Sequence, residues 1–243
     1  MNMTTKKMNC KLKTNKNMKK VFLFLLPVFI ISCVDDGIIT LSDKSVTIQY
    51  DESKQLSVNY SSDALKTKTY NYTTSDSTIV SVSSTGLVSG VSIGTAVIKI
   101  SSKDGKYKDE CNFTVTPKSN LYVEPITDFG LTISQVKSKE TRTLSQEGVN
   151  YLVYTDSNPN VRMILYVFNG VDMTLNGSVV MLTEASDIAA EASLFLIERY
   201  RQYDFTDTYK IYKNRKDTLK EAVLSYDKDY GLSVQYWRRT PVL

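Results

Sequence analysis

Apolar and polar residues alternate with a period of two between residues 38 and 117, in short runs separated by turn residues. A strand that buries one face needs an apolar side chain at every second position, so each run predicts a half-buried strand of an antiparallel sandwich. Serine, aspartate and glycine residues between the runs supply the turns. The runs are Val46-Ile48-Tyr50, Leu56-Val58-Tyr60, Ala96-Ile98-Ile100 and Cys111-Phe113-Val115.

The pattern changes after a polar stretch with a proline at residues 116–120, which predicts a linker and a second domain over residues 118–243. Thr132 can cap a short helix over 132–139. Apolar residues three and four apart predict an amphipathic helix over 184–203 behind Thr183 as N-cap. One helix and three strands, then another helix and three strands, favour an α+β domain: an antiparallel sheet of about six strands with both helices on one face. The six predicted strands are 149–155, 161–169, 174–182, 208–213, 218–226 and 230–238.

An apolar run at residues 21–31 lies behind Lys19 and Lys20 and ends just before Cys33. It has the length of a signal-peptide core and is shorter than the ~20 residues of a transmembrane helix. The order of lysines, apolar core and Ser32-Cys33 resembles the lipobox of bacterial lipoproteins, in which the cysteine is lipidated and the leader is removed. The sequence therefore predicts a signal peptide over residues 1–32, a lipid on Cys33 and a tether over 33–37.

The residues after the cysteine, Val34-Asp35-Asp36, resemble the acidic export signal of surface lipoproteins in gut-commensal Gram-negative bacteria. This resemblance implies a place on the outer membrane, facing outward. Several acyl chains on one cysteine anchor a protein firmly, because each buried methylene contributes ~0.8 kcal/mol. We therefore expect the membrane to be a partner through the lipid alone.

Charge and composition exclude several classes of function. Seven of the 30 basic residues precede the apolar run, and their removal leaves 23 basic against 26 acidic residues, which gives no support for nucleic-acid binding. The chain has no histidine and three cysteines, which excludes His-dependent nucleophiles, HExxH zinc helices and disulfide frameworks. Cys111 alternates with apolar residues and is expected to be buried. No catalytic residue, metal or cofactor is predicted.

The first domain also carries a family resemblance. It lies in the stretches Thr73-Thr74-Ser75-Asp76, Ile79-Val80-Ser81-Val82, Gly86-Leu87-Val88-Ser89-Gly90 and Gly94-Thr95-Ala96-Val97-Ile98. Their pattern is similar to group 2 bacterial immunoglobulin-like domains, which implies a spacer or binding unit of a cell-surface protein. Tyr72 stands where the family often has tryptophan, and either ring fills the same interior space. The start of the second domain, residues 124–130, resembles C-terminal domains of uncharacterised lipoproteins, and that resemblance implies no activity.

Trp237 and Arg239 are the candidate ligand-binding residues. Trp237 shares one face of the last predicted strand with Ser233 and Gln235, while the other face is apolar. An exposed tryptophan beside an arginine could stack on a sugar or on a ring of a partner protein, although a neighbouring segment could equally cover this face.

Asp227 and Asp229 could be proposed as the two carboxylates of a glycosidase. Their setting, a Tyr-Asp-Lys-Asp-Tyr-Gly run between two predicted strands, is typical of a solvated hairpin turn. Asp204 and Asp207, at the end of the long predicted helix, are interpreted in the same way.

The leading hypothesis is a non-catalytic surface lipoprotein that acts in binding or adhesion, with a glycan, a host protein or an envelope protein as its partner. The alternative is a structural subunit of an envelope complex that has no external ligand. A carboxylate-only hydrolase is a third hypothesis, disfavoured because no acidic pair lies in a cleft-forming context. An exposed aromatic patch on the last strand would favour binding.

Overall fold

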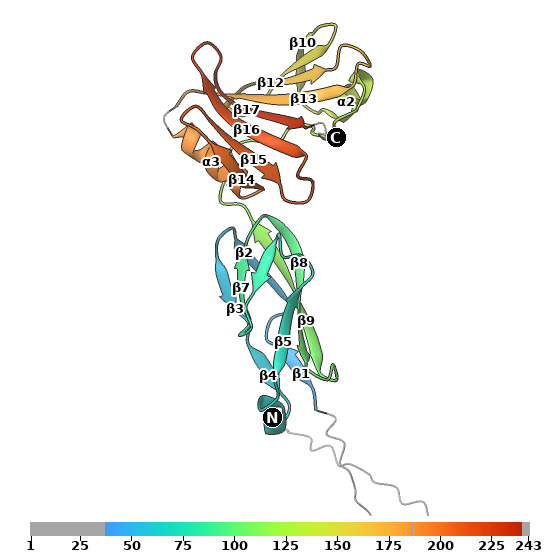
Figure 1. Ribbon diagram of the computed structural model, residues 1–243, viewed down its shortest axis with the longest axis vertical. Coiled ribbons are helices and arrows are strands. Elements are labelled where there is room, and N and C mark those ends of the chain that lie inside the picture. The colour runs from blue at the N-terminus through green and yellow to red at the C-terminus, as the bar shows by residue number, and fades with distance from the viewer. Residues whose placement is uncertain (1–36, 186, 240–243) are drawn as a thin grey trace, which may run out of the picture. The chain divides into compact units, whose positions relative to one another are not determined.

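The structure is a computed structural model that describes residues 37–239 except residue 186 (Figure 1). The predicted leader, Cys33 and the acidic pair Asp35-Asp36 lie outside these residues. From residue 37 onward the chain forms one compact unit with two hydrophobic cores. No helix in the described part of the chain is long and apolar enough to cross a membrane.

Residues 38–116 enclose the first core with short strands, as their alternation predicts. β2, β9, β8 and β5 form a sheet in that order, β3, β7 and β6 form a second one, and β1 pairs with β4. β2 runs parallel to β9, and the other pairs are antiparallel. The prediction of a β-sandwich is confirmed, and a short helix, α1 (Asp63–Lys66), stands where a turn was expected. The strands are β1 (Ile39–Leu41), β2 (Ser45–Gln49), β3 (Ser53–Gln55), β4 (Val58–Tyr60), β5 (Tyr70–Thr74), β6 (Val80–Val82), β7 (Leu87–Gly90), β8 (Gly94–Ser102) and β9 (Lys108–Thr116).

Tyr72 packs against this first core in the place where the family resemblance expects tryptophan. Its ring lies beside Gly86, which has a φ of 83°, and a Cβ on that glycine would lie 2.8 Å from Cζ of Tyr72. Only glycine combines this left-handed turn with this close approach. Cys111 is fully buried, and burial raises the pKa of its thiol, so its expected role as a small core residue is confirmed.

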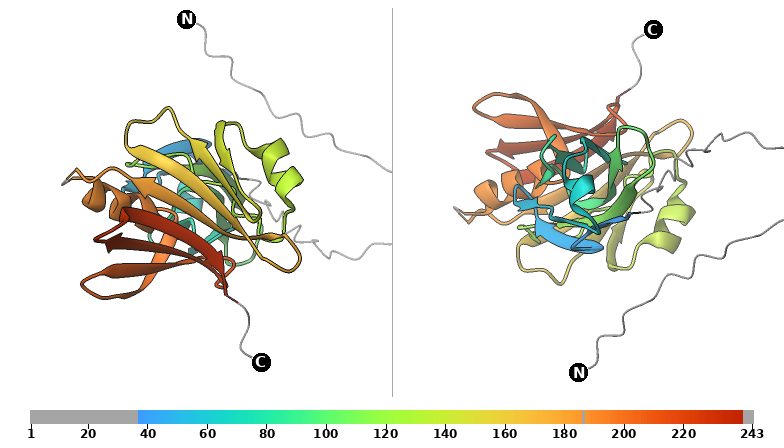
Figure 2. Two further views of the ribbon diagram at one scale, coloured as in Figure 1. Left: turned by 90° about the horizontal axis from the view of Figure 1, so that it is seen from above. Right: turned by 90° about the horizontal axis from the view of Figure 1, so that it is seen from below.

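The second core lies under one eight-stranded antiparallel sheet, in the order β10-β11-β12-β13-β17-β16-β15-β14. Figure 2 shows the strong twist of this sheet. The expected count of about six strands was wrong, because an edge strand at each end was missed. The strands are β10 (Thr143–Glu147), β11 (Tyr151–Thr155), β12 (Val161–Phe168), β13 (Leu175–Leu182), β14 (Tyr200–Phe205), β15 (Tyr209–Asn214), β16 (Lys220–Asp227) and β17 (Gly231–Arg238).

Two helices accompany this sheet. α2 (Ile133–Lys139) begins behind Thr132, whose side chain and Gln135 form a capping box, so this predicted helix is confirmed. The longer predicted helix is wrong at both ends, since α3 (Ile188–Ile197) has Asp187 rather than Thr183 at its N-cap position. Its predicted last turn is β14. Tyr200 is buried there, and a buried tyrosine satisfies the apolar spacing of a helix and of a strand alike.

Both helices bury side chains in the same core: Val136 from α2, and Phe195 and Leu196 from α3. They therefore cover the same face of the sheet. The side chains that alternate with the core residues point to the opposite face, which no helix covers among the described residues. We call this the open face. Its residues include Val153, Met163, Leu165, Val167, Val179, Met181, Ser233, Gln235 and Trp237.

A buried glutamate fixes the polar stretch that the sequence predicts as a linker. Glu198 is fully buried, and its carboxylate accepts hydrogen bonds from the backbone N–H groups of Lys118 at 2.7 Å and Ser119 at 3.2 Å. Its backbone carbonyl accepts a hydrogen bond from Oγ of Ser92 at 2.7 Å. Ser119 is itself fully buried, so this connection is ordered rather than a free spacer.

Candidate functional site

The open face contains a groove of about 390 Å³ over the centre of the sheet. A row of cross-strand partners forms part of its floor: Met181 on β13 lies opposite Ser233 on β17, Ser233 opposite Ser225 on β16, and Ser225 opposite Tyr209 on β15. Leu165, Val179 and Gln235 complete the floor. Tyr226 and Tyr230 stand at the β16–β17 end, where the hairpin projects beyond the sheet.

The polar part of this floor is an uncharged triad. The side-chain amide of Gln235 donates to Oγ of Ser225 at 3.0 Å and to Oγ of Ser233 at 3.2 Å, and the two hydroxyl oxygens are 3.3 Å apart. Among the described residues, the amide oxygen of Gln235 accepts no hydrogen bond. Ser233 is only 5% exposed, so the triad offers a ligand mainly the amide oxygen of Gln235 and the hydroxyl group of Ser225, which Ser233 supports from below.

The tyrosines beside the triad are exposed but have an ordered backbone. Tyr230 is 69% exposed and Tyr226 57% exposed. The carboxylate of Asp227 accepts hydrogen bonds from the backbone N–H groups of Asp229 at 2.8 Å and Tyr230 at 3.1 Å, and the guanidinium of Arg162 donates to the carbonyl oxygen of Tyr230 at 3.2 Å. These contacts fix the backbone of the turn at Tyr230, and both tyrosines line the groove.

Exposed aromatic rings gather on this half of the sheet. Every large aromatic side chain that is exposed among the described residues lies on β14 to β17 or in the turn before β17. They do not share one face, because Phe205 lies opposite Lys210 and Tyr226 opposite the core residue Leu232, which places both by register on the helix-covered side. Burying exposed rings is favourable, so the three that line the groove indicate a contact surface. The six are Tyr203, Phe205, Tyr209, Tyr226, Tyr230 and Trp237.

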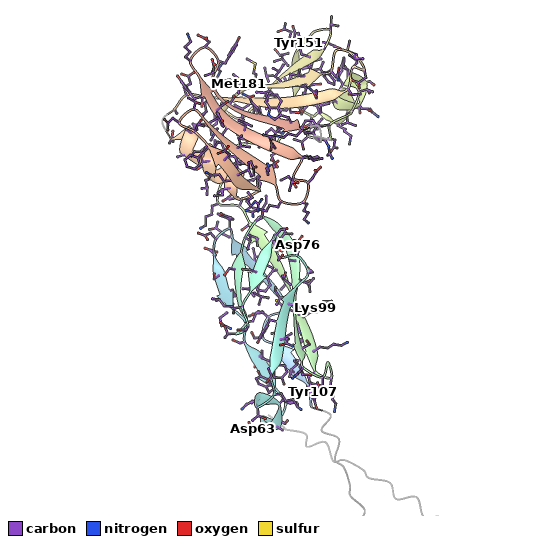
Figure 3. The ribbon with its side chains drawn as sticks, in the orientation of Figure 1. Asp63, Asp76, Lys99, Tyr107, Tyr151 and Met181 are labelled. Atoms are coloured by element: carbon purple, nitrogen blue, oxygen red, sulfur yellow. The ribbon has the colours of Figure 1, made fainter. Side chains whose placement is uncertain are left out.

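A second, apolar section of about 500 Å³ continues the groove toward β11. Figure 3 labels two of its lining residues, Tyr151 on β11 and Met181 on β13. The two sections share Leu165, Met181 and Tyr230, so they lie next to each other on the open face. We call the two sections together the open-face groove.

Trp237 lies on the open face, two residues beyond Gln235 on β17. The alternation in the sequence predicts this placement. Its cross-strand partner on β13 is Gly177, and the indole covers that glycine. The side chain is 36% exposed, so about two thirds of it is covered by the sheet itself. Its role in binding stays a prediction.

Arg239 is engaged by a buried carboxylate. Its Nε donates to Oε2 of Glu221 at 2.7 Å, and Glu221 lies opposite Trp237 in the sheet with a side chain only 3% exposed. Nζ of Lys213 lies 3.8 Å from the other carboxylate oxygen. Arg239 therefore lies near Trp237 as predicted, but its charge is largely neutralised within the protein.

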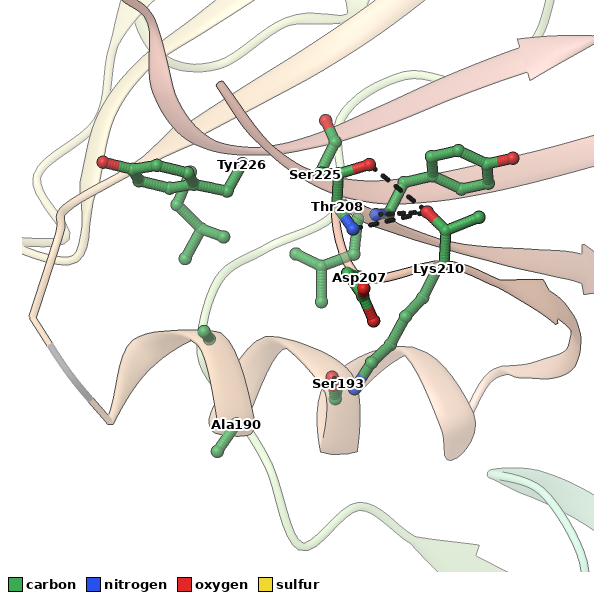
Figure 4. A pocket seen from close by; sticks show the side chains of 12 residues that line it. Ala190, Ser193, Asp207, Thr208, Lys210, Ser225 and Tyr226 are labelled. Carbon is green, nitrogen blue, oxygen red and sulfur yellow. Dashed lines mark hydrogen bonds between the residues drawn. The ribbon is translucent and has the colours of Figure 1, made fainter. Parts of the chain in front are cut away.

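The helix-covered side of the sheet has a hollow of about 580 Å³ between α3 and the tips of β15 and β16 (Figure 4). The side chain of Lys210 crosses this hollow, and its Nζ donates a hydrogen bond to Oγ of Ser193 at 3.0 Å. Asp207 lines this hollow, whereas the carboxylate of Asp204 accepts a hydrogen bond from the backbone N–H of Phe205. The hollow thus holds one of the two aspartates rather than a facing pair.

The sequence pointed to Trp237 but missed the groove residues Gln235, Ser225 and Tyr230. The interpretation of the Tyr-Asp-Lys-Asp-Tyr-Gly run as a turn is confirmed, and the carboxylate of Asp227 accepts two backbone hydrogen bonds within that turn. The sequence signal for this groove is the pair of tyrosines in that run, because large rings exposed at a solvated hairpin indicate a contact surface.

The comparisons with known proteins find one family match, and it lies within the first domain. One similar solved structure is titled "Crystal Structure of a Bacterial Ig-like Domain Containing GH10 Xylanase from Termite Gut"; it shares 17% identity, with a TM-score of 0.26 over 41% of this chain and 23% of that chain. No curated protein matches the chain. The model of the bacterial Ig-like domain (group 2) matches residues 38–113, so this segment is the part of the chain for which a family match is found.

Proposed function

We propose that the chain is a non-catalytic binding or adhesion protein of the bacterial surface whose ligand lies on the open face of the C-terminal sheet. The observation that carries this proposal is the set of three exposed tyrosines, Tyr209, Tyr226 and Tyr230, that line one groove. Aromatic residues dominate the energetics of binding surfaces because each ring buries a large apolar area.

The remaining parts of the chain fit such a protein. The proposed order is a lipid on Cys33, a tether, an immunoglobulin-like module as a spacer, and an α+β binding domain with both helices on the face away from the ligand. Helices that cover only one face leave the other face free for contact. The surface location rests on the lipobox resemblance and on Asp35-Asp36.

An envelope subunit without an external ligand is the second candidate. The observation that favours it is the apolar section of the groove, where Val153, Met163 and Val167 lie beside Leu165 and Met181. An apolar surface of this kind could be covered permanently by another protein.

Capture experiments with matched variants separate these functions. The purified chain is tested against glycan arrays and envelope extracts together with Tyr230→Ala and with Phe205→Ala, an exposed aromatic that does not line the groove. We expect Tyr230→Ala to lose a ligand that Phe205→Ala retains. If both variants retain every captured ligand, the open-face groove is not the binding site. Stable copurification with one envelope protein in fixed ratio would favour the subunit.

A further inference from the structure

We propose that the open-face groove binds an uncharged oligosaccharide, with its rings against the tyrosines and its hydroxyl groups on the Gln235-Ser225-Ser233 triad. This inference rests on the proposed binding function and names the class of its ligand. Three observations carry it: the charges at the groove are paired, apolar rings stand next to neutral hydrogen-bonding groups, and the site lies on the face of a sheet rather than at its edge.

The groove offers no unpaired charge to a ligand. Among the described residues that line it, Arg162 and Asp227 are charged. Nη1 of Arg162 lies 3.7 Å from the carboxylate of Glu184 and also donates to the carbonyl of Tyr230, while Asp227 accepts two backbone N–H groups of its own turn. Burying an ionic ligand costs free energy unless a counter-charge meets it, so the groove suits a neutral ligand.

The side chains match the two-sided chemistry of a sugar. A pyranose ring has an apolar C–H face, which can lie on Tyr230 or Tyr209, and hydroxyl groups at its edge, which can donate to the amide oxygen of Gln235 and exchange hydrogen bonds with Ser225. Neutral hydrogen bonds beside exposed rings give orientation without charge.

The dimensions allow more than one sugar unit. Met163, Met181, Ser233, Ser225 and Tyr209 are successive cross-strand partners from β12 to β15. Four strand spacings give this row a length of about 19 Å. Its composition changes from apolar through neutral polar to aromatic. The apolar end suits the methyl group of an N-acetylated or 6-deoxy sugar.

The position of the groove disfavours an extended peptide. β13, β17 and β16 are paired with each other by backbone hydrogen bonds beneath the groove. A bound peptide strand normally satisfies its backbone by pairing with a free sheet edge, and the edges of this sheet are β10 and β14. On the open face a peptide backbone would meet only the few polar side chains of the triad.

The test uses the purified full chain on a panel of uncharged oligosaccharides that includes N-acetylated and 6-deoxy members, with uronic-acid and sulfated oligosaccharides and zwitterionic-lipid vesicles as other arms. We expect uncharged members to bind, with an affinity that changes less than about twofold between ~0.1 and ~1 M salt. Gln235→Leu and Tyr230→Ala should each weaken binding at least tenfold. Phe205→Ala, the matched control, should change it less than twofold. A thermal melt establishes that each variant is folded. If Gln235→Leu is unfolded, the binding result for Tyr230→Ala decides the test.

The other outcomes overturn the inference in distinguishable ways. Salt-sensitive binding of acidic oligosaccharides, or vesicle binding, that Tyr230→Ala abolishes would show the wrong ligand class but keep the proposed function. The same holds if no oligosaccharide binds and a purified envelope protein binds in a Tyr230-dependent way. If no arm yields a ligand sensitive to Tyr230→Ala, both the inference and the proposed function are wrong.

Discussion

Trp237 lies across Gly177, its cross-strand partner on β13, so closely that a Cβ on the glycine would be 3.1 Å from Cε3 of the indole. An aromatic ring that packs over a glycine shields the exposed backbone of the sheet, and this contact also restricts the position of the ring. The indole is thus preorganised on the open face, 36% exposed and two residues from the polar triad.

Trp237 lines neither section of the groove, but it lies two residues beyond Gln235 on the same face of β17. Trp237→Ala should therefore weaken the capture of a ligand that extends along β17 by ~1–3 kcal/mol, the scale of one aromatic anchor. We expect it to destabilise the fold by ~1–2 kcal/mol, less than the ~3–5 kcal/mol of a tryptophan in a core. Gly177→Val is the matched control, because it displaces the ring without removing it. The chain has one tryptophan, so its fluorescence reports both binding and displacement. A stability loss of core size would remove Trp237 as a candidate contact.

A buried ionic network after α2 should be essential for stability. The side chain of Arg142 is 11% exposed; its Nε lies 2.6 Å from Asp156 and its Nη1 lies 3.0 Å from Glu140, whose side chain is 2% exposed. Arg142→Met leaves two buried carboxylates without their counter-charge and should cost ~3–5 kcal/mol in chemical denaturation. Lys137→Met, which breaks an exposed pair, should cost below ~1 kcal/mol. Equal costs would contradict the network.

The same network should make stability fall in acid. Burial raises the pKa of Glu140, but hydrogen bonds from Tyr166 and the backbone of Arg142, with the Arg142 charge, lower it more, so the net pKa is below the ordinary 4.5. A pKa lower in the folded state stabilises the fold above the ordinary value, and this contribution is lost as the pH falls below it. The free energy of unfolding, measured by chemical denaturation, should fall more between pH 6 and pH 3 for the wild type than for Arg142→Met. Equal losses would place the acid-sensitive groups elsewhere.

Period-two alternation made most strands predictable, whereas other features required the tertiary structure. β10 has the sequence TLSQE, a single apolar residue and no buried position, so nothing in its pattern distinguishes it from a loop. The groove depends on strand order, because β17 lies between β13 and β16 and thereby brings Gln235 beside Val179. Alternation shows which face a residue occupies but not which strand lies next to it.

The two modules are expected to fold separately, because each has its own core. Residues 38–117 and 118–243, expressed apart, should each melt in one cooperative transition. The 118–243 piece should melt somewhat lower than in the whole chain, because it loses the hydrogen bond from Ser92 to Glu198. Ser92→Ala in the whole chain is the matched variant for that contact. A 118–243 piece that is unfolded alone would overturn this domain division.

Cys33→Ala should abolish acyl labelling and leave the leader attached, because the cysteine is the predicted site of both reactions. Cys10→Ala, within the predicted leader, should give a labelled and processed protein. Labelling with a radioactive fatty acid and the mass of the product measure both effects. A trimmed Cys33→Ala protein that still partitions into membranes would contradict the assignment.

The parallel pairing of β2 with β9 has a mechanical consequence. β2 stands near the start of the first module and β9 at its end, and five residue pairs join them, from Ser45 with Asn112 to Gln49 with Thr116. Tension between the two ends of the module pulls parallel neighbours in opposite directions along their length, so the bonds between them resist shear together instead of opening one after another. The module is therefore built to transmit a pulling force without unravelling from its ends.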